Sequence, residues 1–125
     1  MTTRVLSLAG WLLLVTACRG GNPEYLSYTT STGGDARRGH ELIERYECGT
    51  CHTIPGVSSA HGVLASPLFW FAQRSFVAGE LPNTPENLVR WIQDPRAIEP
   101  RTAMPAVGLS EAQARDVAAY LYTLR

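Results

Sequence analysis

Cys48-Gly49-Thr50-Cys51-His52 is the stretch that decides how this chain folds. Cysteines three positions apart on a helical turn face the same way, and here a histidine follows directly. This CxxCH spacing is typical of the covalent attachment of a c-type haem, in which both thiols add to the haem vinyl groups. The stretch therefore predicts one haem c bound through Cys48 and Cys51, with the imidazole of His52 on the iron.

The composition fits one small domain with a short appendage, since the chain has 125 residues. Eleven basic side chains balance 11 acidic ones, and every basic residue is an arginine. A neutral balance argues against a nucleic-acid partner, which selects for an excess of positive charge. A charged docking surface here would use guanidinium groups or carboxylates.

Residues 1–17 have the pattern of an export signal. Arg4 precedes an apolar run, Val5 to Val15, that is too short to cross a bilayer as a helix. Val15-Thr16-Ala17-Cys18 resembles a bacterial lipobox, in which the signal is cut before a cysteine that becomes lipidated. Haem attachment uses two of the three cysteines, which leaves Cys18 for the lipid. We expect a bacterial periplasmic protein anchored by lipidated Cys18, with ordinary signal cleavage nearby as the alternative.

The rest of the chain divides into a tether and a helical domain. Residues 18–34 are rich in Gly, Ser and Thr and are predicted to form a flexible tether. Residues 35–125 contain three helix starts marked by capping residues: Asp35, Thr84 before Pro85, and Ser110 with Gln113. No stretch alternates with a period of two for long. The predicted fold class is therefore all-α, with long loops that wrap a flat cofactor.

Several motifs recur in a recognisable order along this domain. They are Gly39, the CxxCH motif, Ser66-Pro67-Leu68, Trp91, Thr102-Ala103-Met104-Pro105 and Tyr120-Leu121. In order and spacing, residues 34–125 resemble the class I, mitochondrial-type monohaem cytochromes c of bacteria. The resemblance implies a small cytochrome c fold, in which the N-terminal and C-terminal helices cross at Gly39 and Tyr120.

The resemblance also implies that Met104 is the second axial ligand of the iron. Met104 is the only methionine after the predicted signal, and Pro100 and Pro105 stiffen its loop. Ligation by His52 and Met104 closes both axial positions, which favours electron transfer over catalysis at the iron. His40 and His61 are rival ligands, although we expect both to be solvated.

Other residues are expected near the haem from the same resemblance. The Pro67 carbonyl accepts a hydrogen bond from Nδ1–H of His52, unless the proline only breaks the loop. Trp91 and Thr102 hydrogen-bond a haem propionate, although core packing would also explain Trp91. Leu68 is also assigned to the haem site. Arg74 is expected to neutralise a haem propionate, and the alternative is that it is simply a surface arginine.

Leu68-Phe69-Trp70-Phe71 departs from the family, in which the position of Trp70 often carries a small residue. We expect Trp70 to pack in the core, and exposure to a partner near the haem edge is the alternative.

The function implied by the resemblance is a one-electron carrier, not an enzyme, in a respiratory chain. Its implied partners are a quinol–cytochrome c reductase and a terminal oxidase. A fixed haem subunit of a larger respiratory complex is one alternative, and a gas sensor or peroxidase-like protein with a labile sixth ligand is another. A zinc site built from Cys48, Cys51, His52 and His61 is the structural alternative.

Overall fold

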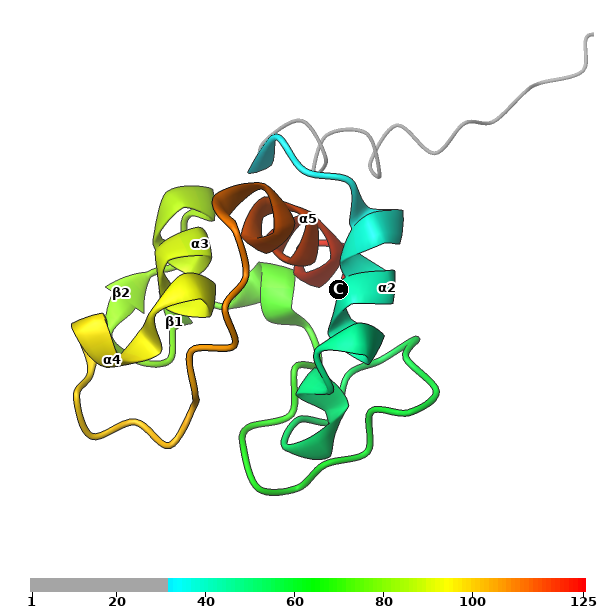
Figure 1. Cartoon of the computed structure of the whole chain (residues 1–125), viewed down its shortest axis with the longest axis horizontal. Coiled ribbons are helices and arrows are strands. Elements are labelled where there is room, and N and C mark those ends of the chain that lie inside the picture. The colour runs from blue at the N-terminus through cyan, green and yellow to red at the C-terminus, as the bar shows by residue number, and fades with distance from the viewer. Residues whose placement is uncertain (1–31) are drawn as a thin grey trace, which may run out of the picture.

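The computed structural model describes residues 32–125. The predicted signal peptide, Cys18 and most of the predicted tether lie outside the described residues. In the described part of the chain, the α-helices are α2 (Ala36–Arg45), α3 (Pro85–Gln93), α4 (Pro95–Ile98) and α5 (Glu111–Leu121) (Figure 1). Two 3-10 turns, η1 (Cys48–Thr50) and η2 (Phe71–Gln73), stand in the long connection after α2. The expected helical fold is confirmed.

A small antiparallel sheet was not expected from the sequence. Its two strands are β1 (Phe76–Val77) and β2 (Leu81–Pro82), with Val77 paired to Leu81. The strands have two residues each, which is too short to leave an alternating pattern that sequence reading could detect.

Each helix begins where a polar side chain caps its free backbone amides. The capping residues are Asp35 for α2, Thr84 for α3, Asp94 for α4 and Ser110 for α5. At α5 the Ser110 and Gln113 side chains bond each other's backbone amides, so the predicted capping box is confirmed. Local sequence therefore sets where the helices begin.

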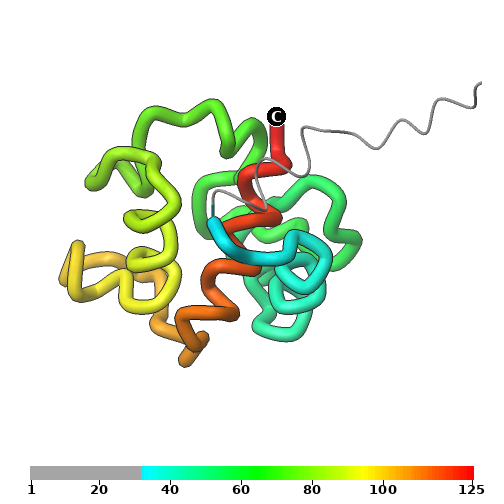
Figure 2. Tube along the Cα trace, turned by 90° about the horizontal axis from the view of Figure 1, so that it is seen from above, coloured from blue at the N-terminus to red at the C-terminus, as the bar shows by residue number. Residues whose placement is uncertain are grey.

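Helix α5 forms the centre of the domain, between α2 on one side and α3 on the other (Figures 1 and 2). The core is a single cluster that these three helices share with the loops. Among its buried side chains are Ile43 of α2, Leu88 of α3 and Val117 of α5. Helices α2 and α3 both pack against α5, which therefore joins the two sides of the domain.

The crossing of α2 and α5 depends on Gly39. A Cβ atom at this position would lie 2.0 Å from the carbonyl oxygen of Asp116 and 3.1 Å from Cβ of Tyr120. The two backbones can approach this closely only because residue 39 has no side chain. The predicted crossing at Gly39 and Tyr120 is therefore confirmed.

Replacing Gly39 with Ala is expected to lower the free energy of unfolding of the haem-loaded protein by about 2–3 kcal/mol. The added methyl group forces the helices apart, although alanine alone favours a helix over glycine by about 1 kcal/mol. Chemical denaturation followed by circular dichroism measures the change. Glu41→Ala is the control, because Glu41 is exposed on the same helix and an exposed change there should alter stability by no more than about 0.5 kcal/mol. A Gly39→Ala protein as stable as the wild type would contradict this packing.

Residues 32–34, the last residues of the predicted tether, pack against α5. Thr32 is fully buried, and Nη1 of Arg115 donates to its carbonyl oxygen at 3.0 Å. At Gly34 a Cβ atom would lie 2.1 Å from the carbonyl oxygen of Arg115. Residues 32–34 therefore pack on the helical domain, and the domain boundary expected at residue 35 stays a prediction.

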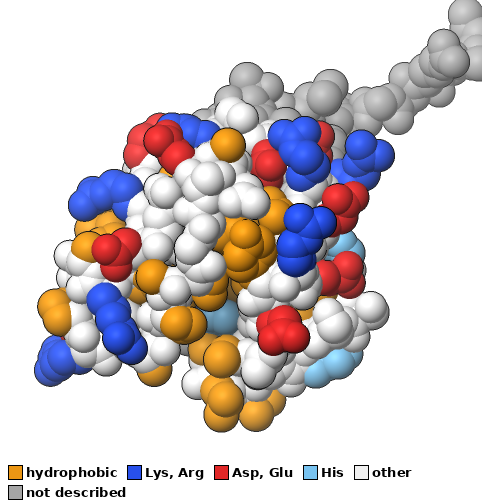
Figure 3. Space-filling model, in the orientation of Figure 1, with side chains coloured by type: hydrophobic (Ala, Val, Ile, Leu, Met, Phe, Trp, Pro, Cys, Tyr) orange, Lys and Arg blue, Asp and Glu red, His pale blue; other side chains and the backbone are white. Residues whose placement is uncertain are grey.

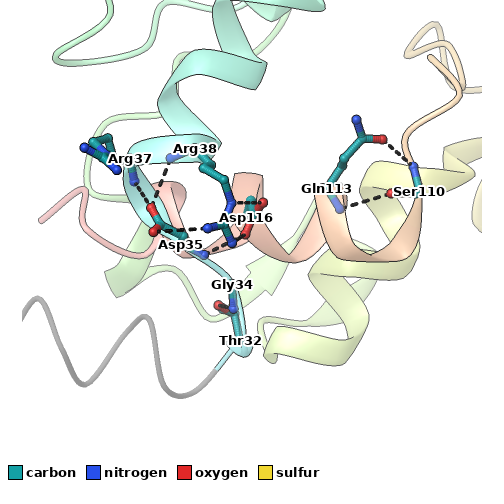
Figure 4. A network of polar contacts seen from close by, with 8 residues as sticks. All are labelled: Thr32, Gly34, Asp35, Arg37, Arg38, Ser110, Gln113 and Asp116. Carbon is teal, nitrogen blue, oxygen red and sulfur yellow. Dashed lines mark hydrogen bonds and ion pairs between the residues drawn. The ribbon is translucent and has the colours of Figure 1, made fainter.

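The buried carboxylate of Asp116, on α5, binds the residues at the start of α2 (Figure 4). Asp116 is 7% exposed and accepts hydrogen bonds from the Asp35 amide at 2.7 Å and from Nε and Nη2 of Arg38 at 3.0 Å each. The hydrogen bonds from Arg38 satisfy a charge that would otherwise be costly to bury. The start of α2 and the middle of α5 are thereby joined at a fixed position.

Candidate functional site

The CxxCH motif occupies the turn that follows α2. Glu47 adopts a left-handed conformation, with φ of 55°, and ends the helix before η1 begins. The amides of Cys51 and His52 then donate to the Cys48 carbonyl at 3.3 and 3.0 Å. Both cysteines are half-buried, and they form no disulfide with each other. The turn therefore presents two unlinked sulfur atoms immediately before the histidine.

Two glycines bring the next loop against this turn. A Cβ atom on Gly49 would lie 2.4 Å from Cα of Ala60, and one on Gly62 would lie 2.4 Å from the Thr50 carbonyl oxygen. The Gly62 amide donates to the Gly49 carbonyl at 2.9 Å. At either glycine there is no space for a side chain, and the loop that contains Gly62 therefore packs closely against the CxxCH turn.

The imidazole of His52 is oriented by a backbone carbonyl. Its Nδ1 lies 2.7 Å from the carbonyl oxygen of Ser66. Because a carbonyl can only accept, Nδ1 carries the proton and Nε2 keeps the lone pair that a metal requires. A backbone partner for His52 was predicted, but the predicted residue, Pro67, is wrong by one position.

The Pro67 carbonyl instead accepts a hydrogen bond from the Arg74 guanidinium. A second nitrogen–oxygen contact joins the same Nη2 atom to the Phe69 carbonyl at 3.1 Å, and the guanidinium lies 5.5 Å from the centre of the Phe71 ring. In a loop without regular structure, the sequence does not show which way each carbonyl points. The acceptor for His52 is therefore Ser66 and not the neighbouring Pro67. Arg74 therefore braces the loop next to His52, and its predicted role at a propionate stays a prediction.

Met104 lies in the long loop between α4 and α5, half-buried against the core cluster. Its amide donates to Oγ1 of Thr102 at 3.2 Å, and the Thr102 amide donates to the Glu99 carbonyl at 3.0 Å. Figure 1 shows this loop and the loop after η1 on the same side of α5, away from the point where the described chain begins. Ligation of iron by Met104 stays a prediction, as does a propionate contact from Thr102.

Two other predicted site residues pack in or against the core. Trp91 on α3 is 9% exposed and belongs to the core cluster, while Leu68 is half-buried and packs against it. The Leu68 amide donates to the Thr53 carbonyl at 2.8 Å, which ties the loop to the residue after His52. Core packing accounts for both side chains, and their contacts to a haem stay predictions.

The rival histidines are used differently. Nε2 of His40 lies 3.0 Å from the Gly56 carbonyl, and its ring meets the edge of Tyr120 with centroids 5.2 Å apart. His40 is thus half-buried and bonded, not solvated as expected, whereas His61 is exposed as expected. Within residues 32–125, no three His, Cys, Asp or Glu side chains converge as a metal would require. The zinc alternative therefore has no site in this part of the chain.

The surface near these loops is apolar. Figure 3 shows hydrophobic side chains gathered between the α3–α4 side of the molecule and the α2 side, around a hollow in which a histidine side chain is visible. Two strongly exposed apolar residues, Val63 at 88% and Leu64 at 81%, follow directly after Gly62. Apolar side chains beside an oriented imidazole suit a large, flat and mostly apolar ligand.

The residues present fit a covalently bound haem. Cys48 and Cys51 supply two free thiols, His52 supplies an Nε2 lone pair fixed by its Nδ1 hydrogen bond, and Met104 supplies a half-buried thioether. Two cysteine thiols that add to the vinyl groups, an imidazole and a methionine thioether are the protein groups that a c-type haem uses. The fold and this donor set define a class of protein: a small helical domain that carries haem c.

Comparison with known families identifies the class more closely. Residues 36–125 match the family described as cytochrome c, which is most of the chain, so the chain belongs to the cytochrome c family. It is a class I monohaem cytochrome c, and it carries one haem c through Cys48 and Cys51. The domain is therefore a haem-binding domain of the electron-transfer type.

Three relatives are similar to this chain. Cytochrome c oxidase subunit 2 of Alkalihalophilus pseudofirmus is 36% identical over 92 residues, which cover 72% of this chain and 26% of the relative. Cytochrome c oxidase subunit 2 of Bacillus subtilis is 30% identical over 112 residues, covering 86% and 32%. Cytochrome c-type cyt cy of Rhodobacter capsulatus is 34% identical over 112 residues, covering 82% and 56%. The chain thus spans about a quarter to a third of the two oxidase subunits and about half of the third relative.

No helix among residues 32–125 is long and apolar enough to cross a membrane.

Proposed function

We propose that this protein is a one-electron carrier of a respiratory chain, with His52 and Met104 as the axial ligands of its haem. The observation that carries the proposal is the Nδ1–H of His52 bonded to the Ser66 carbonyl at 2.7 Å, which leaves Nε2 to bind iron. The haem, when bound, supplies a one-electron redox couple. The chain's contribution is to hold its ligands in place in both oxidation states.

The two ligand positions favour a carrier over a catalyst. The hydrogen bond to the Ser66 carbonyl makes the His52 imidazole a more basic iron ligand. The neutral sulfur of Met104 favours the reduced state of the iron, which raises its redox potential. The Met104 loop is stiffened by Pro100 and Pro105 and by the hydrogen bond that the Met104 amide donates to Oγ1 of Thr102. A closed site of this kind leaves no position for oxygen or peroxide, so we assign no enzymatic activity to the domain.

The proposed electron acceptor is a terminal oxidase, and the proposed donor is a quinol–cytochrome c reductase. Two of the relatives are named cytochrome c oxidase subunit 2, and in both the similar region is only part of a longer chain. Those two relatives favour a second candidate function, in which this domain is a fixed haem subunit of an oxidase. The haem chemistry is the same in both cases, and only the lifetime of the complex differs.

We further propose that the protein is held in the periplasm by a lipid on Cys18. Residues 19–31 separate that cysteine from Thr32 and reach roughly 45 Å when fully extended. The packing of Thr32 and Gly34 on α5 sets where this segment leaves the domain. In Figure 1 the described chain begins on the opposite side of α5 from the loop after η1 and the loop that holds Met104. An anchor on the preceding segment therefore leaves these two loops accessible to partners.

The test is the oxidation of the purified, reduced holoprotein by solubilised membranes of the source bacterium, together with a potentiometric titration. We expect a single one-electron transition and cyanide-sensitive oxidation. Co-purification of a stoichiometric complex after detergent extraction would favour the fixed subunit over the mobile carrier. Absence of any oxidation by these membranes would contradict an oxidase as the acceptor.

A further inference from the structure

An uncharged stretch begins at the haem attachment site. Residues 48–73 contain no Asp, Glu, Lys or Arg, although charged residues make up 18% of the chain. Four large apolar side chains in this stretch are exposed: Val63, Leu64, Phe69 at 42% and Trp70 at 63%. Val63 and Leu64 lie in the loop against the CxxCH turn and suit the haem itself. Phe69 and Trp70, whose ring centroids are 6.0 Å apart, form a separate surface, named here the aromatic surface.

The backbone at Trp70 is in a conformation that large side chains rarely adopt. Its φ is 49° and its ψ is 36°, in the left-handed region that glycine occupies without strain. The indole nevertheless remains mostly exposed, contrary to the expected core packing. Of the three consecutive aromatics only Phe71 is buried, against Tyr122. Folding therefore gives no evident reason for a tryptophan at position 70.

The neighbours of Trp70 hold its backbone in this conformation. Before it, the Arg74 guanidinium binds the carbonyl groups of Pro67 and Phe69. After it, Phe71 is buried, and the Ala72 amide donates to the Leu124 carbonyl at 3.0 Å. A rigid, exposed aromatic loses little conformational freedom when a partner covers it, which is the property of a binding hot spot.

The aromatic surface is also close in structure to the histidine ligand. Phe69 lines the same shallow depression as Thr53 and His61, and the Leu68 amide donates to the Thr53 carbonyl at 2.8 Å. Ser66, whose carbonyl orients His52, is three residues before Phe69. A partner seated on Phe69 and Trp70 would therefore lie next to the His52 side of the haem.

We propose that the aromatic surface is the docking site for the electron acceptor, and that it binds an uncharged, apolar patch on that protein. The proposal rests on the proposed function, because it names the contact through which the carrier reaches its oxidase. The lack of charge in residues 48–73 selects this occupant. A strongly charged partner or an anionic membrane surface would find no charged side chain in residues 48–73, and the Arg74 guanidinium beside this surface is already bonded to the Pro67 and Phe69 carbonyls.

The test compares wild type, Trp70→Gly and Phe76→Ser as reduced, haem-loaded proteins oxidised by solubilised membranes of the source bacterium. Phe76 is the matched control, an aromatic 55% exposed on β1, outside the uncharged stretch. We expect Trp70→Gly to raise KM at least about tenfold and Phe76→Ser to leave it unchanged. We expect the wild-type KM to change less than about threefold from about 0.01 M to about 1 M NaCl, as the Debye length falls from about 30 Å to about 3 Å.

Folding of the variant is tested separately. Glycine relieves the left-handed backbone, so the Tm and the haem absorption spectrum of Trp70→Gly should match the wild type, the Tm to within about 4 °C. A lower Tm with an altered spectrum would show that the indole supports the haem and would overturn the docking site.

Three kinetic results would also overturn the proposal. They are an unchanged KM in Trp70→Gly, an equal loss in Phe76→Ser, and a KM that rises steeply with salt. Sedimentation of a wild-type dimer that Trp70→Gly abolishes would assign the aromatic surface to a second copy of this chain instead. If membranes oxidise none of the proteins, wild type included, the proposed function fails, which is a different result from failure of the docking site alone.

Discussion

Replacing Met104 with Ala is expected to convert a closed haem into one that binds carbon monoxide when reduced. Removal of the thioether leaves the sixth position to water or to the added gas, so the iron no longer has a neutral sulfur ligand. The midpoint potential should fall by at least about 0.1 V, within the range of about 0.8 V that axial ligands span. Potentiometric titration and carbon monoxide difference spectra measure both effects.

Val107→Ala is the matched control for this change. Val107 lies in the same loop, three residues after Met104, and is exposed. We expect its potential and its gas binding to match the wild type. If Met104→Ala also keeps the wild-type potential and excludes carbon monoxide, another residue completes the coordination and the assignment of Met104 is wrong.

Replacing both Cys48 and Cys51 with Ser is expected to yield a chain that is largely unfolded. Without thioether bonds the haem is not retained, and the long loops that enclose it lose the apolar surface on which they pack. The exposed Val63 and Leu64 beside the motif would then have no haem to cover them. Far-ultraviolet circular dichroism should show the helical signal reduced by more than about half.

Cys18→Ser provides the control for loss of a cysteine as such. It leaves the CxxCH motif intact, so we expect covalent haem and a native helical signal. A double variant of Cys48 and Cys51 with the full helical signal and cooperative unfolding would show that the apolar core folds without its cofactor.

The parts of the fold that follow from nearby residues could be predicted from sequence. The helix starts at Asp35, Thr84 and Ser110 depend on side chains that cap amides two or three residues away. The ion pair of Asp116 with Arg38 and the packing of Thr32 on α5 join positions far apart in the chain. No local pattern encodes such contacts, so the sequence does not predict them.

The same distinction applies to the site. The CxxCH motif and the single late methionine are readable because their chemistry depends on residue type and spacing. The acceptor for His52 was misplaced from Ser66 to Pro67, because carbonyl directions in a loop depend on contacts such as those of Arg74. The exposure of Trp70 was also missed, since a run of three aromatics does not reveal which of them the backbone turns outward.

The central claim is axial ligation of one haem by His52 and Met104, and the absorption spectrum of the oxidised holoprotein tests it most directly. A sulfur-to-iron charge-transfer band near the red end of the visible spectrum, lost in Met104→Ala and kept in Val107→Ala, is the predicted result. A wild-type spectrum without that band, from a reduced protein that binds carbon monoxide at neutral pH, would contradict the account.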